Sequence, residues 1–342
     1  MSTPAEKTIS ILGAGSWGTA LAIQFARKGR PVLIWGRDPE HLEELVRARS
    51  NQRYLPDADF PPSLKIESIF EKAAAASDDL LLVVPSHAFR VLLTALKPLL
   101  RKNHRISWAT KGFELDTGKL PHQVAAEVLS DNYPLAVLSG PTFAREVGSG
   151  LPTAMTVASD NQEFARELAG EISDDSFRAY TSNDVIGVEV GGAVKNVLAI
   201  GAGVSDGLGY GSNTRIALIT RGLVELGRLG HALGAKQETF MGLAGMGDLV
   251  LTCTDDQSRN RRMGLALAAG KSPDEASREI GQVVEGVMAA RAVHQVSSHQ
   301  RVEMPICDQV YRILYEGATP ESAVQALMTR DLKSEDHSAN QP

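Results

Sequence analysis

Three glycines near the start of the chain restrict its possible folds more than any other feature. Gly13, Gly15 and Gly18 have Gly-x-Gly-x-x-Gly spacing, directly after the apolar run "TISIL" and at the start of the helical pattern "TALAIQFARKG". In that setting one glycine forms a tight turn, one lets the backbone approach a pyrophosphate, and one lets helix and strand pack closely. The helix N-terminus also offers free N–H groups to phosphates. The pattern therefore predicts a dinucleotide-binding unit.

The segments that follow alternate between strand and helix. The runs "PVLIW", "LLLVV", "RISWA" and "PLAVLS" predict buried strands, and "TAMTVAS" and "FRAYTS" predict two more. Amphipathic stretches separate them, which indicates an α/β Rossmann-type domain, a mostly parallel sheet with helices on both faces.

The strand pattern stops at residue 183, and helical periodicity continues to about residue 330. We therefore expect a dinucleotide-binding Rossmann domain over residues 1–183 and an all-helical, all-α substrate domain over 184–330. The polar residues 331–342 are expected to be a disordered tail.

Composition excludes several classes of function. The net charge of -6 argues against nucleic acid as a partner. No apolar run approaches the roughly 20 residues of a membrane span, and the N-terminus does not resemble a signal peptide. The two cysteines, Cys253 and Cys307, lack metal-ligand spacing, so we expect no metal and a reducing, cytoplasmic location.

The end of the second predicted strand bears on the choice of cofactor. NAD-specific folds usually place an acidic residue there, but this chain has Gly36, Arg37 and Asp38 in succession. The Arg37 guanidinium could bind a 2′-phosphate, which favours NADPH with NADH also accepted. Asp38 could still bind a ribose diol, and in the alternative interpretation both residues only cap the next helix.

Two groups of polar residues are candidates for binding a phosphorylated substrate. Ligands of doubly wound sheets lie beyond the carboxyl ends of the strands, where the sequence places Lys111, Gly140 and Thr142. A second group of donors and one carboxylate follows in "GMGDLVLTCTDDQSRNRR", where Asp248 comes after a predicted Gly-x-Gly turn. Its members are Asp248, Ser258, Arg259 and Asn260. The alternative for "RNRR" is a solvated basic patch.

Lys195 stands in "GGAVKNVLAIGAG", a stretch of mostly small or apolar residues. On a helix, Gly191 and Ala199 would lie one turn from Lys195, so no long side chain there would shield its amine. Desolvation lowers the pKa of a lysine, which suits an amine that donates a proton to an alkoxide and takes it back in the reverse reaction. Alternatively, Lys195 extends to solvent or pairs with Glu189 or Asp248.

Six stretches in order resemble the bacterial-type NAD(P)-dependent glycerol-3-phosphate dehydrogenases, from about residue 8 to residue 330. They are "LGAGSWGTALA", "ATKGFE", "SGPTFAREV", "EVGGAVKNVLAIGAGVSDGLG", "GLAGMGDLVLTCT" and "SRNRR". The resemblance implies an oxidoreductase that interconverts dihydroxyacetone phosphate and sn-glycerol 3-phosphate by hydride transfer with NAD(P)H, for phospholipid biosynthesis. It also implies a cytoplasmic homodimer.

The resemblance further implies a role for individual residues. Lys195 would be the catalytic proton acceptor. The substrate would contact Lys111, Gly140, Thr142, Lys195, Asp248, Ser258, Arg259 and Asn260. Beside the glycines, the cofactor would contact Ser16, Trp17, Arg37, Lys111, Ala144, Arg259, Val283 and Glu285.

Two other interpretations stay open on the sequence. A β-hydroxyacid or 6-phosphogluconate-type dehydrogenase would have an asparagine four residues after the lysine, where this chain has Ala199, its asparagine being Asn196. A nucleotide-sensing regulator would bind NAD(P) without chemistry. It would not need Lys195, Lys111 and the Ser-Arg-Asn donors together.

Overall fold

The structure, a computed structural model, describes residues 7–130 and 133–331. They form two compact units: an N-terminal unit of residues 7–111 and 121–185, and a C-terminal unit of residues 112–120 and 186–331. The remainder of the expected tail, residues 332–342, lies outside the described residues.

The division between the units differs in two ways from the one that the strand pattern indicated. It falls after Val185, two residues beyond the expected boundary between 183 and 184. Segment 112–120 belongs to the C-terminal unit, because Phe113 and Leu120 are buried in the apolar core of that unit. Hydrophobic periodicity reports only local structure, so it cannot show that a short segment packs with a different unit from its neighbours in the sequence.

The N-terminal unit is built on an eight-stranded sheet with the order β10-β9-β8-β7-β6-β1-β2-β5. Neighbouring strands are parallel except for the antiparallel pair β8 and β9. The strands are β1 (Ile9–Leu12), β2 (Val32–Trp35), β5 (Leu64–Ile66), β6 (Asp79–Leu82), β7 (Arg105–Trp108), β8 (Leu135–Ser139), β9 (Thr153–Ala158) and β10 (Phe177–Ser182). The seven strands expected from the apolar runs are thereby confirmed, as is the mostly parallel sheet.

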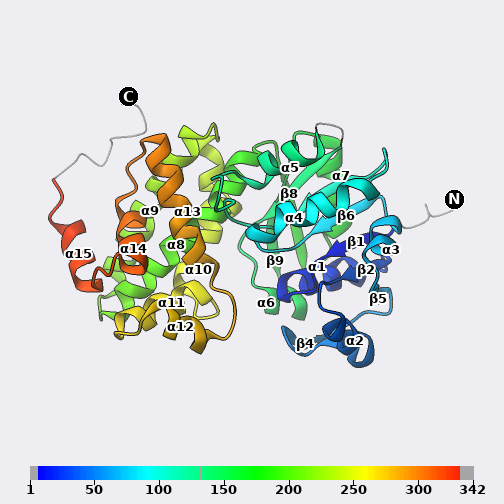
Figure 1. The fold of residues 1–342 in the computed structure, drawn as a ribbon, viewed down its shortest axis with the longest axis horizontal. Coiled ribbons are helices and arrows are strands. Elements are labelled where there is room, and N and C mark those ends of the chain that lie inside the picture. The colour runs from blue at the N-terminus through cyan, green and yellow to red at the C-terminus, as the bar shows by residue number, and fades with distance from the viewer. Residues whose placement is uncertain (1–6, 131–132, 332–342) are drawn as a thin grey trace. The chain divides into compact units, whose positions relative to one another are not determined.

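Helices cover both faces of this sheet (Figure 1). Helix α1 packs with α6 and α7, whereas α4 packs with α5. The chain leaves β1 toward β2 but later leaves β6 in the opposite direction, so right-handed crossovers place α1 and α4 on opposite faces. Because β9 and β10 run antiparallel to β8, the right-handed crossover between them returns α7 to the face of α1. The helices are α1 (Ser16–Arg27), α2 (Pro39–Ala48), α3 (Phe70–Ala75), α4 (Ser86–Leu96), α5 (Pro121–Leu129), α6 (Ala144–Ser149) and α7 (Gln162–Ile172).

Three strands of the N-terminal unit were not expected from the sequence. A hairpin of β3 (Ser50–Asn51) and β4 (Leu55–Asp59) follows α2, and β5 lies at the edge of the main sheet. These strands span two, five and three residues, and β4 has the sequence "LPDAD". Such short or polar segments lack the apolar alternation by which a strand is identified.

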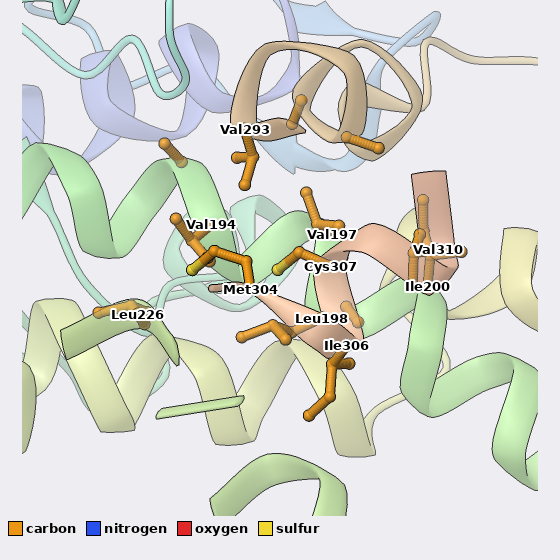
Figure 2. Close-up of a cluster of buried hydrophobic side chains, with 14 of the residues drawn as sticks. Val194, Val197, Leu198, Ile200, Leu226, Val293, Met304, Ile306, Cys307 and Val310 are labelled. Atoms are coloured by element: carbon orange, nitrogen blue, oxygen red, sulfur yellow. The ribbon is translucent and has the colours of Figure 1, made fainter. Parts of the chain in front are cut away.

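The C-terminal unit packs its helices around α8 (Val185–Gly207) (Figure 1). Figure 2 shows part of its core, where Val194, Val197 and Leu198 of α8 lie among side chains such as Val293 and Ile306 from later helices. The other helices are α9 (Ser212–Ala232), α10 (Asp248–Thr254), α11 (Arg259–Ala268), α12 (Pro273–Ile280), α13 (Glu285–Gln300), α14 (Pro305–Tyr315) and α15 (Pro320–Met328). The all-helical character is confirmed.

Helix α8 is long and apolar enough to pass a composition test for a membrane span, with a mean hydropathy of 1.5. The expectation that no apolar run reaches that length is wrong for this helix. Single polar residues such as Glu189 and Lys195 interrupt the run in the sequence, although the helix as a whole is apolar. However, 89% of the 18-residue apolar stretch of this helix is buried inside the protein. A helix that is apolar on all sides and covered by other helices is the core helix of a globular unit.

Candidate active site

The three glycines of the first loop occupy three different environments. Gly13 has φ +136°, and a Cβ there would lie 2.1 Å from the Val83 carbonyl oxygen. A Cβ on Gly18 would lie 1.9 Å from the Gly13 carbonyl oxygen, whereas one on Gly15 would meet nothing within 4 Å. Gly13 is thus required by the turn and Gly18 by packing. Gly15 borders open space, and a side chain there would fill the place where a pyrophosphate approaches.

The first turn of α1 supplies donors beside this open space. Thr19 N–H bonds to the Gly15 carbonyl, so the N–H groups of Ser16, Trp17 and Gly18 precede the first intrahelical hydrogen bond of α1. The Trp17 indole Nε1 is buried without a partner among the described residues. The positive end of the helix dipole also favours a bound anion. The residues present therefore fit the phosphates of a dinucleotide.

The loop after β2 separates the roles of its two charged residues. Asp38 is the N-cap of α2, where it accepts from His41 N at 3.3 Å, and it forms an ion pair with Arg53 at 2.8 Å. The hydrogen bond from His41 and the Arg53 guanidinium lower the pKa of Asp38. Arg37 is exposed and has no hydrogen-bond or ion-pair partner in the described part of the chain. The capping interpretation therefore holds for Asp38 and leaves Arg37 available.

The ends of β7 and β8 bring together a second set of predicted residues in the N-terminal unit. Lys111 Nζ donates to the Gly140 carbonyl at 3.4 Å, and Thr142 Oγ1 donates to the same oxygen at 3.3 Å. Gly140 has φ +155°, and a Cβ there would lie 2.9 Å from Met155 Cα, so this turn excludes other residues. Ala144 begins α6 directly afterwards.

Lys195 is buried in α8 and held by two groups of α10. Its ammonium donates to Asp248 Oδ1 and, at 3.0 Å, to Thr252 Oγ1. Thr252 Oγ1 in turn donates to the Asp248 backbone carbonyl at 2.6 Å. The Lys195 side chain is 10% exposed and that of Asp248 2%. Burial disfavours the charged ammonium of Lys195, and the neighbouring carboxylate favours it. Asp248 therefore offsets part of the free-energy cost of holding the lysine charge away from water.

The structure shows the Lys195–Asp248 pair, one of the alternatives considered for this lysine, and adds a further partner. Of the two partners considered, Asp248 is hydrogen-bonded to Lys195. Thr252 was missed, although residues four apart on a helix share a face and Thr252 is four residues after Asp248. Because Thr252 bonds both the lysine amine and the backbone of Asp248, it fixes the direction of the amine.

Two features around this group differ from the expectation. A Cβ on Gly191 would lie 2.2 Å from the Ala244 carbonyl oxygen, so the neighbouring backbone occupies the space that Gly191 was expected to leave open beside the amine. The predicted Gly-x-Gly turn before Asp248 is a π-helical segment, Leu243–Gly247, and Gly247 has helical angles, φ −57° and ψ −52°. Asp248 therefore begins a helix, positioned by the close approach of that segment to α8.

The first turn of α11 contains the other polar residues. Ser258 is its N-cap and accepts from Arg261 N at 3.2 Å. Asn260 is buried, donates to Asn196 Oδ1 at 2.8 Å and accepts from Gly286 N at 2.9 Å. The N–H groups of Arg259 and Asn260 precede the first intrahelical bond of α11, which suits an anion. The side-chain oxygens of Ser258 and Asn260 both accept internal hydrogen bonds, so they are less available to a ligand than expected.

The remaining predicted residues lie where α13 begins. Val283 is 56% exposed, and the partly buried Glu285 is the first residue of α13. The predicted site residues thus form two sets. Gly13, Gly15, Ser16, Trp17, Gly18, Arg37, Lys111, Gly140, Thr142 and Ala144 belong to the N-terminal unit, and Lys195, Asp248, Ser258, Arg259, Asn260, Val283 and Glu285 belong to the C-terminal unit. Among residues 7–130 and 133–331, no three His, Cys, Asp or Glu side chains are grouped as metal ligands.

Comparisons with known proteins agree over nearly the whole chain. Models of the N-terminus and the C-terminus of NAD-dependent glycerol-3-phosphate dehydrogenase match residues 8–165 and 184–325. Glycerol-3-phosphate dehydrogenase of Aeromonas hydrophila is 58% identical over 328 residues, 96% of this chain and 98% of its own. That of Vibrio parahaemolyticus is 57% identical, with 96% and 95% covered. The crystal structure of a glycerol-3-phosphate dehydrogenase from Coxiella burnetii is 49% identical, with a TM-score of 0.93 over 96% of this chain and 100% of its own.

Proposed function

The chain belongs to the NAD-dependent glycerol-3-phosphate dehydrogenase family, and we propose that Lys195 exchanges the proton with the substrate oxygen in its reaction. The enzyme interconverts dihydroxyacetone phosphate and sn-glycerol 3-phosphate with NAD(P)H, a step that supplies glycerophospholipid biosynthesis. Reduction adds a hydride to the carbonyl carbon and a proton to its oxygen. The nicotinamide supplies the hydride when bound, and the protein must supply the proton and the orientation.

The observation that supports this role is the hydrogen-bonded group of Lys195, Asp248 and Thr252. The Lys195 ammonium donates its proton to the developing alkoxide, and in oxidation the neutral amine takes it back. Asp248 and Thr252 are positioning residues, because both hold the amine in one direction and the Asp248 carboxylate compensates its charge inside the protein. Such fixed dipoles and charges stabilise a developing anion better than mobile water does.

Cofactor binding is assigned first to the glycine loop of the N-terminal unit. The Gly13–Gly18 turn and the first turn of α1 hold the pyrophosphate, and Arg37 holds the 2′-phosphate of NADPH. We also assign cofactor contacts to Lys111, Ala144, Arg259, Val283 and Glu285. With NADPH, Arg37→Ala should raise the Michaelis constant far more than with NADH, which is also accepted. Equal changes for the two cofactors would refute the assignment of Arg37.

Substrate binding is assigned to charged and polar groups that suit a phosphate dianion. The α11 N-terminus with Ser258, Arg259 and Asn260 offers backbone N–H groups and a guanidinium. Lys111, Gly140 and Thr142 complete this anion-binding assignment. Asp248 is assigned to the substrate as the partner of Lys195 and not as a phosphate ligand, because a carboxylate repels a dianion. Reduction of dihydroxyacetone phosphate, with no reduction of unphosphorylated dihydroxyacetone, would support a phosphate site.

The decisive experiment is Lys195→Ala, measured by the turnover of dihydroxyacetone phosphate and by the dissociation constant of NADPH. We expect kcat to fall by about 10²–10⁴-fold, the usual contribution of general acid–base catalysis, with NADPH binding nearly unchanged. Lys271→Ala is the control, because the side chain of that lysine is 39% exposed and pairs only with Glu279 among the described carboxylates. Turnover retained in Lys195→Ala would exclude the proposed role.

We also propose that the enzyme acts in the cytoplasm as a homodimer. Large apolar side chains exposed in the C-terminal unit, among them Ile216 (56%) and Met328 (80%), support association with another copy. Light scattering coupled to gel filtration should give twice the chain mass, and a monomer at micromolar concentration would contradict the proposal.

A further inference from the structure

Asn51 lies in the unexpected hairpin of β3 and β4, outside every predicted site, and is fully buried. A buried carboxamide must satisfy two donors and two acceptor positions within the protein. Asn51 satisfies all four. Its Nδ2 donates to the Ala14 carbonyl at 3.0 Å and to Thr19 Oγ1 at 2.8 Å. Its Oδ1 accepts from Tyr54 N at 3.2 Å and from His41 Nε2 at 3.0 Å.

The orientation of this amide is fixed by its partners. The Ala14 carbonyl can only accept and the Tyr54 N–H can only donate, so exchanging Nδ2 and Oδ1 would lose both bonds. His41 must then carry its proton on Nε2. The ring of His41 also meets Tyr54 edge-on, with centroids 5.1 Å apart, so the hairpin side of the contact is packed as well as bonded.

The two acceptors of Asn51 Nδ2 lie in the glycine loop and in the start of helix α1, which follows it. Ala14 stands between Gly13, whose φ is +136°, and Gly15, beside which a Cβ would meet open space. Thr19 N–H bonds to the Gly15 carbonyl, and the Thr19 hydroxyl is the second group that Asn51 holds. The glycines give this loop conformational freedom, and the Asn51 amide connects Ala14 in the loop and Thr19 in the first turns of α1 to the β3–β4 hairpin.

One of the two donors to Asn51 Oδ1, the His41 ring, connects the same amide to α2, at the other end of the dinucleotide site. His41 lies in the first turn of α2, three residues after its N-cap Asp38 and four after Arg37. We therefore propose that Asn51 is a positioning residue for the cofactor, which sets the glycine loop against the start of α2 and so fixes the distance between the pyrophosphate and 2′-phosphate subsites. This proposal rests on the proposed cofactor role of the glycine loop, and not on the role of Lys195.

The test is Asn51→Asp, measured by titration of the purified enzyme with NADPH. A carboxylate keeps both acceptors for Tyr54 and His41 but cannot donate, and it faces the Ala14 carbonyl with a negative charge. We expect the dissociation constant of NADPH to rise at least tenfold. At saturating NADPH and substrate, kcat should stay within about threefold of wild type, because Asn51 touches no reacting group.

The matched control is Gln24→Glu in helix α1, the helix that also contains Thr19. Gln24 is also buried, and its Nε2 donates to the Ile172 carbonyl at 3.1 Å and to Asp174 at 2.8 Å. The substitution therefore makes the same chemical change, five residues beyond Thr19. We expect a comparable loss in Tm but a dissociation constant of NADPH within threefold of wild type. An equal rise in both variants would show a general loss of stability and would overturn the proposal.

A second ligand and a second variant make the test specific. Adenosine 2′-phosphate carries no pyrophosphate, so its affinity should fall much less than that of NADPH in Asn51→Asp, and an equal fall would overturn the proposal. If Asn51→Asp does not fold, Thr19→Val removes one of the two acceptors and should raise the NADPH dissociation constant about threefold. Unchanged NADPH binding in a folded variant of either kind refutes the proposal, whereas wild type that binds no NADPH refutes the function of the glycine loop itself.

Discussion

Gly191→Ala tests whether the position of the α10 carboxylate, relative to Lys195, is set by backbone contact with α8. A Cβ at residue 191 would lie 2.2 Å from the Ala244 carbonyl oxygen and 3.1 Å from its carbon. The obstacle is backbone and not the end of a flexible side chain. Restoring an ordinary contact therefore requires a displacement of about 1 Å of the π-helical segment that leads into Asp248.

The expected effects on stability and on activity differ in size. Overpacking costs about 1–3 kcal/mol, and replacing glycine within a helix returns about 1 kcal/mol of helix propensity, so the net loss of stability should be at most about 2 kcal/mol. A misplacement of about 1 Å can cost about 100-fold in rate. We therefore expect a folded protein whose kcat is reduced about 100-fold.

The assay is the oxidation of saturating NADPH by dihydroxyacetone phosphate, followed by absorbance, together with thermal unfolding. Gly170→Ala provides the control, because that helical glycine in α7 has nothing within 4 Å of its Cβ position. This control should gain up to about 1 kcal/mol in stability and keep its activity. The reasoning is wrong if Gly191→Ala behaves like the control, with a raised Tm and a kcat within twofold of wild type.

Three further predictions concern buried charged and reactive groups. Burial raises the pKa of Glu225 to about 7, so the contribution of this group to stability should be complete below its ordinary value of 4.5, and about 3 kcal/mol should be lost as pH rises through 7. In Glu225→Gln, Tm should vary much less between pH 5 and 8, and an unchanged pH profile would contradict this. Burial raises the pKa of the Cys253 thiol to about 12 and raises that of Cys307, so neither should react with Ellman's reagent at pH 8 before unfolding in guanidinium. Asp79 is buried between Arg30 at 2.7 Å and Arg105 at 2.5 Å, so Asp79→Asn should cost about 3 kcal/mol in denaturant unfolding, and a loss below 1 kcal/mol would show that the network contributes little.

The features that could be predicted from the sequence are those encoded within a short stretch of chain. Five apolar runs identified strands of the main sheet because a buried parallel strand is continuously hydrophobic. Two further strands were identified from "TAMTVAS" and "FRAYTS", although the second is largely exposed. The spacing of Gly13, Gly15 and Gly18 indicated the phosphate-binding turn, since each glycine answers a local backbone requirement. The unusual position of Lys195 among small and apolar residues was also visible in its own stretch.

The contacts that give these residues their roles could not be predicted in the same way. Thr252 went unnoticed because a threonine in an apolar helix carries no signal until the helix is placed beside Lys195. Asn51 gave no signal either, since its hairpin is too short for a strand pattern and its partners Ala14 and Thr19 are more than thirty positions away.

By itself, the sequence determined the two kinds of secondary structure, the glycine turn that follows the first strand and the choice of Lys195 as the candidate for proton exchange. Only the tertiary structure decided that Asp248, 53 positions from Lys195, is its partner, and that Gly191 admits a neighbouring backbone rather than leaving space beside the amine. The physical reason is that hydrophobic periodicity and backbone preference act within a few residues. Hydrogen bonds between distant side chains depend on how helices pack, and packing is settled by the whole core at once.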